Sequence, residues 1–266
     1  MNVNRSTEKL LLTYGLLVFT LSIPIWVIGG LTGLELMPGL PFGALMTFCP
    51  MIAALILVYR ERRLAGVTGL LKRSFDLRRI ESKVWYLPVV LLMPVVMFLS
   101  YWVMRLLGLP LPTPEISLLS GLTLFPIFFV AALGEELGWS GYIIDPMQER
   151  WGALRASIIL GVIWAAWHVV PFVQVPRSPV WIVSQCLFLV AVRVLHVWLY
   201  NNTGKSVFGQ AVFHAMLNVS WQLFPNNGSH YNPHIAALAV VMIAVLVAVV
   251  WESGTLQQYR YAKQAA

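Results

Sequence analysis

Residues 122–144 read LTLFPIFFVAALGEELGWSGYII, an apolar stretch whose only charged members are the adjacent Glu135 and Glu136. An α-helix needs about 20 mostly apolar residues to cross the hydrocarbon core of a bilayer. The stretch therefore predicts a transmembrane helix. An ionisable group inside such a helix costs about 2.5–3.5 kcal/mol on insertion scales, so the glutamate pair marks a candidate functional site.

The composition of the whole chain fits a membrane protein. Of its 266 residues, 59% are hydrophobic and 11% are charged, whereas soluble domains usually contain about 25% charged residues. Eleven Trp and nine Tyr suit the two membrane–water interfaces. Two cysteines without C-x-x-C spacing argue against a disulfide framework or a cysteine-based metal site.

Apolar stretches of similar length recur along the chain, separated by breaks rich in proline and glycine. They predict an all-α, polytopic integral membrane bundle of about eight transmembrane helices, with residues 1–266 as a single membrane domain. The predicted spans are Leu10–Leu31, Phe42–Tyr59, Val84–Leu107, Leu122–Ile144, Ala156–Phe172, Val180–Tyr200, Ser206–Leu223 and Ile235–Trp251.

The basic residues suggest an orientation. The connection from Arg60 to Lys83 contains eight Lys and Arg residues, and such residues are enriched in cytoplasmic loops. An even number of spans then places both termini in the cytoplasm. Because topology and contact with the lipid bilayer explain the net charge of +7, we expect no nucleic-acid partner. We expect the protein in the cell inner membrane of a prokaryote.

Few ionisable groups fall within the predicted spans, and each is a functional hypothesis. Adjacent carboxylates on one helix point about 100° apart, so Glu135 and Glu136 cannot both aim directly at one centre. Gly134 and Gly138 allow neighbouring helices to approach closely. The alternative is a polar pair that only packs helices together. The ionisable residues within spans are Arg105, Glu135, Glu136, His168, Arg193, His196 and His214.

Two further motifs place polar groups in apolar helices. His168 ends the Trp-rich run that begins at Trp164, although a lone histidine is often only a satisfied core residue. His214 and Asn218 are four residues apart and share one face of a helix. They can address one carbonyl or one metal, or they can form interhelical hydrogen bonds, worth about 0.6 kcal/mol on average.

Together these residues provide the groups that hydrolysis requires. One glutamate can act as general base towards water, helped by His168. His214 and the amide of Asn218 can donate to the oxyanion of a tetrahedral intermediate. Glutamate and histidine are also acceptable ligands for a catalytic zinc, and no H-E-x-x-H motif decides between the two mechanisms.

The three motifs resemble those of the CPBP family of intramembrane proteases, which includes the CAAX prenyl endopeptidases and the bacteriocin-processing Abi proteins. GEELGWSGY at 134–142 resembles the first motif, a Glu-Glu pair with an arginine four residues after the second glutamate. WAAWH at 164–168 resembles the second, and HAMLN at 214–218 resembles the third. The family-like catalytic core covers residues 122–224.

The resemblance implies an eight-helix fold with an intramembrane cavity and cleavage of a membrane-associated or lipid-modified peptide. It makes Glu135 the activator of water with His168 beside it, and Glu136 a supporting carboxylate. His214 and Asn218 would stabilise the oxyanion or bind metal. The cofactor is unknown: a zinc held by Glu135, His168 and His214 and a metal-free glutamate mechanism are equally open.

Ser140 stands where the family has its arginine. We hypothesise that Arg193, otherwise unexplained in the sixth span, supplies the missing charge to Glu136, with Ser140 and Trp164 as further supporting residues. We expect His196, one turn from Arg193, to make only local contacts. In the predicted orientation the motifs lie nearer the cytoplasmic side, so the cavity is expected to face the cytoplasm.

Two other classes of function could use the same fold and the same motif residues. A non-catalytic membrane scaffold or immunity factor could retain the fold and bind a partner. A small transporter could use the carboxylates and histidines as a proton relay. Against a transporter, the chain shows no matching pair of interrupted helices in two halves.

Overall fold

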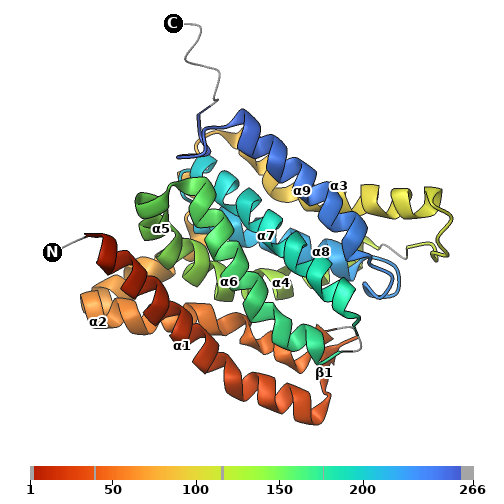
Figure 1. Ribbon diagram of the computed structural model, residues 1–266, viewed down its shortest axis with the longest axis horizontal. Helices are drawn as coiled ribbons and strands as arrows, with labels where there is room; N and C mark the ends of the chain where they lie inside the picture. The colour runs from red at the N-terminus through yellow and green to blue at the C-terminus, as the bar shows by residue number, and fades with distance from the viewer. Residues whose placement is uncertain (1–2, 39, 115–116, 176, 259–266) are drawn as a thin grey trace, which may run out of the picture.

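The computed structural model describes residues 3–38, 40–114, 117–175 and 177–258, and α-helices dominate these residues (Figure 1). The helices are α1 (Val3–Thr32), α2 (Cys49–Lys72), α3 (Tyr86–Leu106), α4 (Leu118–Gly138), α5 (Ile144–Trp151), α6 (Ala153–Val173), α7 (Pro179–Asn202), α8 (Val207–Gln222) and α9 (Pro233–Val250). Two short strands, β1 (Glu35–Met37) and β2 (Leu40–Pro41), pair antiparallel. The main hydrophobic core joins buried residues from α1 to α9.

The predicted all-α membrane bundle is confirmed. Seven helical segments of the described chain are long and apolar enough to cross a membrane, and their outward side chains, such as Leu238 and Met242 of α9, are more than half exposed. The remaining predicted span, Ser206–Leu223, corresponds to α8. At 16 residues α8 is about 24 Å long, which is shorter than a hydrocarbon core of about 30 Å. Most of its residues are buried, so α8 is an interior helix.

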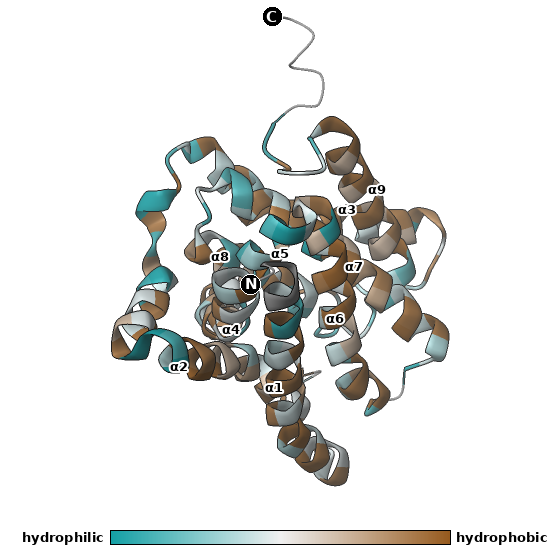
Figure 2. Cartoon of the chain, turned by 60° about the vertical axis from the view of Figure 1, so that its left-hand side comes forward, coloured by the Kyte–Doolittle hydropathy of each residue, from teal (hydrophilic) through white to brown (hydrophobic). Residues whose placement is uncertain are grey.

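One end of the bundle, called here the basic end, gathers the start of α1, the end of α2, α5 and the turn between α7 and α8. Arg73 links several of these segments by hydrogen bonds. Its guanidinium donates to the hydroxyl of Tyr200 at 2.7 Å and to the carbonyls of Gly141 at 2.7 Å and Lys205 at 2.8 Å. In Figure 2 the hydrophilic colour gathers along the later part of α2 and the segment after it.

The segment Arg60–Lys83 is not the loop that the sequence predicts. The helix α2 continues through it to Lys72, with a kink at Arg63 where φ is 55°. Asp76, just beyond, caps the interior helix α8: it accepts from the hydroxyl of Ser206 at 2.7 Å and from the backbone N–H of Phe208 at 3.1 Å. An aspartate at a helix N-terminus satisfies free N–H groups and the helix dipole. The basic segment therefore anchors the helix that carries His214 and Asn218.

The opposite end, called here the hairpin end, contains the β1–β2 hairpin and the connections after α6 and α8. Gln222 at the end of α8 donates to the carbonyl of Pro38 at 3.0 Å, and Gln174 after α6 donates to the carbonyl of Trp26 at 2.7 Å. In Figure 1 β1 lies at the end of α1 remote from the N-terminus. The bundle thus has one end rich in basic residues and one end that carries the hairpin.

The glutamate pair lies where α4 packs most tightly against its neighbours. A Cβ atom on Gly138 would lie 2.5 Å from the carbonyl oxygen of Pro50 in α2 and would collide with the hydroxyl of Tyr14 in α1. Only glycine allows this approach. After Gly138 the chain forms one π-helical turn, Trp139–Ile143, a local widening that often occurs at functional sites.

We predict that Gly138→Ala lowers the thermal unfolding temperature of the purified protein, because overpacking a tight contact costs about 1–3 kcal/mol. Gly121→Ala in the same helix is the matched control, since no atom lies within 4 Å of its added Cβ. Alanine favours a helix over glycine by about 1 kcal/mol, so the control is expected to be neutral or stabilising. Equal melting temperatures for the two variants would contradict the packing argument.

Candidate active site

The two adjacent glutamates of α4 enter different environments, as their angular separation predicts. Glu135 is 6% exposed and lines a cavity, whereas Glu136 is fully buried and does not line it. The two carboxylates therefore need separate descriptions.

Glu135 is held by two neutral donors. The indole Nε1 of Trp164 in α6 donates to its Oε2 at 2.7 Å. The hydroxyl of Thr47, just before α2, lies 3.3 Å from its Oε1 and also donates to the carbonyl of Ala131 at 2.8 Å. No cation is within ion-pair distance of this carboxylate in the described chain. Its remaining lone pairs can accept a proton from a water molecule in the cavity.

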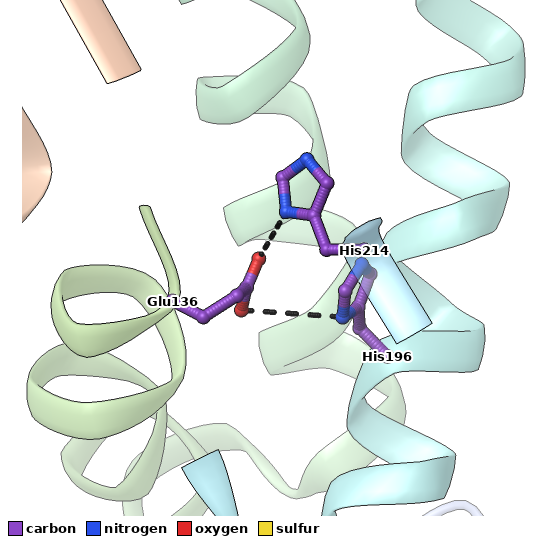
Figure 3. Close-up of side chains that lie close together, drawn as sticks. All are labelled: Glu136, His196 and His214. Carbon is purple, nitrogen blue, oxygen red and sulfur yellow. Dashed lines mark hydrogen bonds and ion pairs between the residues drawn. The ribbon is translucent and has the colours of Figure 1, made fainter. Parts of the chain in front are cut away.

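Glu136 is surrounded by donors from three elements. Nη1 of Arg193 in α7 lies 3.2 Å and 3.1 Å from its two oxygens. Nδ1 of His214 in α8 lies 3.0 Å from Oε1, and the hydroxyl of Ser140 donates to Oε2. Figure 3 shows this carboxylate between His214 and His196, whose Nδ1 is 3.9 Å from Oε2. Glu136 is thus a buried structural anion that ties α4 to α7 and α8.

Arg193 lies where the sequence analysis hypothesised a compensating charge. Ser140, at the position of the family arginine, offers one hydroxyl to Glu136, and the full positive charge comes from the neighbouring helix. The guanidinium of Arg193 is 1% exposed and stacks over the ring of Trp164 at 4.2 Å. One arginine therefore neutralises Glu136 and supports the tryptophan that holds Glu135.

Both motif histidines contact Trp164 through their ring edges. The ring centroids of His168 and His214 lie 5.2 Å and 5.6 Å from it, in near-perpendicular planes. Nδ1 of His168 is 2.8 Å from the carbonyl oxygen of Trp164. Because carbonyl and carboxylate oxygens only accept, Nδ1 must carry the proton in both histidines. In each ring Nε2 is then the nitrogen left for a ligand.

A cavity of about 690 Å³ brings four of the predicted residues together: Glu135, His168, His214 and Asn218 all line it. The amide of Asn218 forms no hydrogen bond to any other described residue, so it remains free for a ligand. Of the other predicted residues, Trp164 lines the cavity. Glu136, Ser140 and Arg193 do not line it and lie behind its wall. Most of the remaining wall is apolar.

The cavity does not open on the side that the sequence predicts. Its outer wall includes Leu36 and Leu40 of the hairpin, Trp181 at the start of α7 and Tyr231 before α9, all at the hairpin end. The expectation that the cavity opens at the end with the basic residues is therefore wrong, because the cavity opens at the hairpin end. The depth of each motif along its helix indicated where its backbone lies but not where the side chains leave an opening.

The residues that could hold a metal differ from the predicted set of Glu135, His168 and His214. In the part of the chain that the structure describes, the group with all ligand atoms within 4.8 Å is Glu136, His196 and His214. Arg193 already contacts both carboxylate oxygens of this group. A divalent cation there would lie against a guanidinium and behind the cavity wall, so this group does not fit a catalytic zinc.

Sequence reasoning missed two contributors. His196 was expected to make local contacts only, yet its Nδ1 lies 2.9 Å from the side-chain amide of Gln210 in α8 and it faces Glu136. Its position one turn from Arg193, on the same face, was the available signal. Thr47 gave no signal, because a single threonine in an apolar stretch is common.

Comparison with known proteins agrees with the motifs. Residues 117–220, which include every motif residue, match the family model "Type II CAAX prenyl endopeptidase Rce1-like". The chain is also 28% identical over 239 residues to "CAAX prenyl protease 2" of Methanococcus maripaludis, an alignment that covers 79% of this chain and 83% of that protein. The chain is therefore similar to CAAX proteases over the region that carries all three motifs. This similarity supports an intramembrane endopeptidase function.

We predict that removing either partner of the buried pair, by Glu136→Gln or Arg193→Gln, destabilises the protein by about 3–5 kcal/mol, because the other charge stays buried without a partner. The double variant should lose much less than the sum of the two single losses. Thermal unfolding of the purified variants measures both effects.

The partly exposed surface pair Glu8–Arg150, with N···O of 3.7 Å, is the matched control. Its single and double variants should change stability by less than about 1 kcal/mol. If Arg193→Gln melted like the Glu8→Gln control and kept full activity, the compensating role of Arg193 would be refuted.

Proposed function

We propose that Glu135 is the general base that activates water for attack on a peptide carbonyl, with His168 beside it. The observation that carries the proposal is the convergence of Glu135, His168, His214 and Asn218 on one cavity. The neutral donors Trp164 and Thr47 fix the orientation of the Glu135 carboxylate without neutralising its charge. A positioned base of this kind contributes about 10²–10⁴-fold to a hydrolytic rate.

The helix α8 supplies donors for the oxyanion from the wall of the same cavity. The free amide of Asn218 can donate directly to the oxygen of the tetrahedral intermediate. Nδ1 of His214 is engaged with Glu136, so Nε2 is the ring nitrogen left for the substrate. In the imidazolium form this Nε2 can donate to the oxyanion.

The proton balance of the proposed reaction is simple. Glu135 takes one proton from water as the hydroxide equivalent adds to the carbonyl carbon. The intermediate then collapses, the C–N bond breaks, and Glu135 returns the proton to the leaving amine. Nε2 of His168 can accept a hydrogen bond from the same water, which orients it.

The substrate class follows from the character of the cavity. Its apolar walls suit a membrane-associated or lipid-modified peptide, and the relative from Methanococcus maripaludis is named for a prenylated substrate. We further propose that the protein lies in the inner membrane of a prokaryote with both termini in the cytoplasm. The basic residues of the segment Arg60–Lys83 support that orientation.

Glu135→Gln and His168→Ala should each lower the rate of peptide cleavage in a membrane preparation. We expect a loss of at least about 10²-fold for Glu135→Gln, because the amide cannot accept the proton from water. Glu61→Gln, at the basic end and 3.1 Å from the hydroxyl of Tyr142, is the control and should cleave normally. Undiminished cleavage by both active-site variants would reject the proposal.

Chelation tests the metal-free form of the mechanism. Because the clustered group of Glu136, His196 and His214 already binds Arg193, we expect cleavage to persist after treatment with 1,10-phenanthroline. Metal analysis of the purified protein should show no stoichiometric zinc. Loss of activity on chelation, with recovery on addition of zinc alone, would instead establish a metal mechanism.

A further inference from the structure

Among the described residues that line the cavity, Arg177 is the only lysine or arginine. It lies in the connection between α6 and α7, and its guanidinium stacks over the ring of Trp181 at 4.8 Å. Such a stack favours one position of the planar cation. No described carboxylate lies within ion-pair distance of Arg177, so its guanidinium N–H groups are available to a ligand.

Two neutral donors belong to the same part of the wall. The indole Nε1 of Trp181 is buried and has no hydrogen-bond partner among the described residues. Gln185 lies one turn further along α7, and its Oε1 accepts from the hydroxyl of Tyr231 at 2.9 Å. The amide N–H groups of Gln185 are therefore left for a ligand. Because buried donors are normally paired, the free indole N–H indicates that this wall receives an acceptor.

The donor cluster of Arg177, Trp181 and Gln185 shares one wall with the proposed catalytic groups. Two successive ring contacts lead from His168 to Trp181: His168 to Phe172, with centroids 5.7 Å apart, and Phe172 to Trp181, with centroids 5.6 Å apart. An extended peptide advances about 3.3–3.6 Å per residue. One short peptide can therefore contact the catalytic groups and the donor cluster at the same time.

The chemistry of the donor cluster defines its ligand. A guanidinium, an indole N–H and an amide N–H all donate hydrogen bonds, and the guanidinium adds a positive charge. The complementary group is an anion with several acceptor positions. A carboxylate meets this requirement, since it is planar, it is ionised at neutral pH and it suits the geometry of arginine. A peptide bound in the cavity can bring such a group with it.

We propose that Arg177, Trp181 and Gln185 form a subsite that binds a carboxylate of the peptide substrate and so selects which peptides are accepted. The carboxylate belongs to the end of the peptide chain or to an aspartate or glutamate side chain. Arg177 is a specificity residue that binds the substrate and takes no part in proton transfer. The identity of the ligand as a substrate rests on the proposed function, but its binding can be measured without cleavage.

Two labelled peptides of identical sequence test the subsite, one with a free C-terminal carboxylate and one with a C-terminal amide. Both carry an apolar flank. Their binding to the full chain with Glu135→Gln is measured by fluorescence anisotropy in nanodiscs of phosphatidylcholine. Adding Arg177→Gln should raise the Kd of the free acid at least about tenfold and that of the amide by less than about twofold, because only the acid loses a charge-assisted hydrogen bond. Arg177→Lys keeps the charge and should recover part of the loss.

Two further variants separate ligand binding from a structural effect. Trp181→Phe keeps an aromatic ring under the guanidinium and removes the indole N–H, so it should weaken binding of the free acid by about threefold and spare the amide. Arg105→Gln is the matched control. Its guanidinium donates to the carbonyl of Leu111 at 3.2 Å and does not line the cavity, so both Kd values should stay unchanged.

A third peptide, amidated and ending in aspartate, identifies the source of the carboxylate. Binding of this peptide that depends on Arg177 supports a side-chain carboxylate. Binding of the free acid alone that depends on Arg177 supports the end of the chain.

Two results would overturn the proposal. One is an equal effect of Arg177→Gln on the free acid and the amide, or no effect on either. The other is an effect that occurs only in nanodiscs containing phosphatidylglycerol and is the same for both peptides, because the anion is then a lipid headgroup.

Cleavage by the chain with Glu135 intact separates this inference from the proposed function. Arg177→Gln should raise the KM of the free acid at least about tenfold and change kcat by less than about twofold, the pattern of lost uniform binding. If neither peptide is cleaved but binding of the free acid still depends on Arg177, the proposed function fails and the subsite stands. If Arg177→Gln cleaves the free acid as efficiently as the unsubstituted chain does, the subsite fails and the proposed function stands.

Discussion

The buried ion pair between Glu136 and Arg193 is the interaction on which the rest of the site depends. Both side chains are at most 1% exposed, so neither charge has water to stabilise it. Removing one partner leaves an unpaired charge in an apolar interior, which is far costlier than breaking a surface pair. The pair fixes α7 against α4, and His214 joins α8 to the same carboxylate. Helices distant in sequence are thereby held in one register around the cavity.

The same ion pair also helps to fix the orientation of Glu135 in the cavity. The guanidinium of Arg193 stacks on Trp164, and the indole N–H of Trp164 holds Glu135. Three consecutive contacts thus link the structural carboxylate to the proposed general base. A base placed this way loses little freedom when the reaction begins, because neighbouring side chains already define its orientation.

The sequence predicted the helices and the motif residues well, because apolar length and polar exceptions are both local signals. It also led to Arg193, since an arginine inside a span needs a partner and Glu136 needed a charge. It could not reveal the opening of the cavity. The direction of the opening depends on side chains such as Leu36 and Tyr231, which come from segments far apart in the chain. His196 was undervalued for a related reason: its partner Gln210 lies on another helix.

The charge that balances Glu136 comes from α7, because position 140 holds a serine. An arginine at position 140 would sit on the same helix as Glu136, whereas the pair with Arg193 joins two helices. The layer that separates the cavity from the basic end is then bonded across the bundle, and Ser140 completes it with one hydroxyl. These bonds between α4, α7 and α8 close the floor of the cavity towards the basic end.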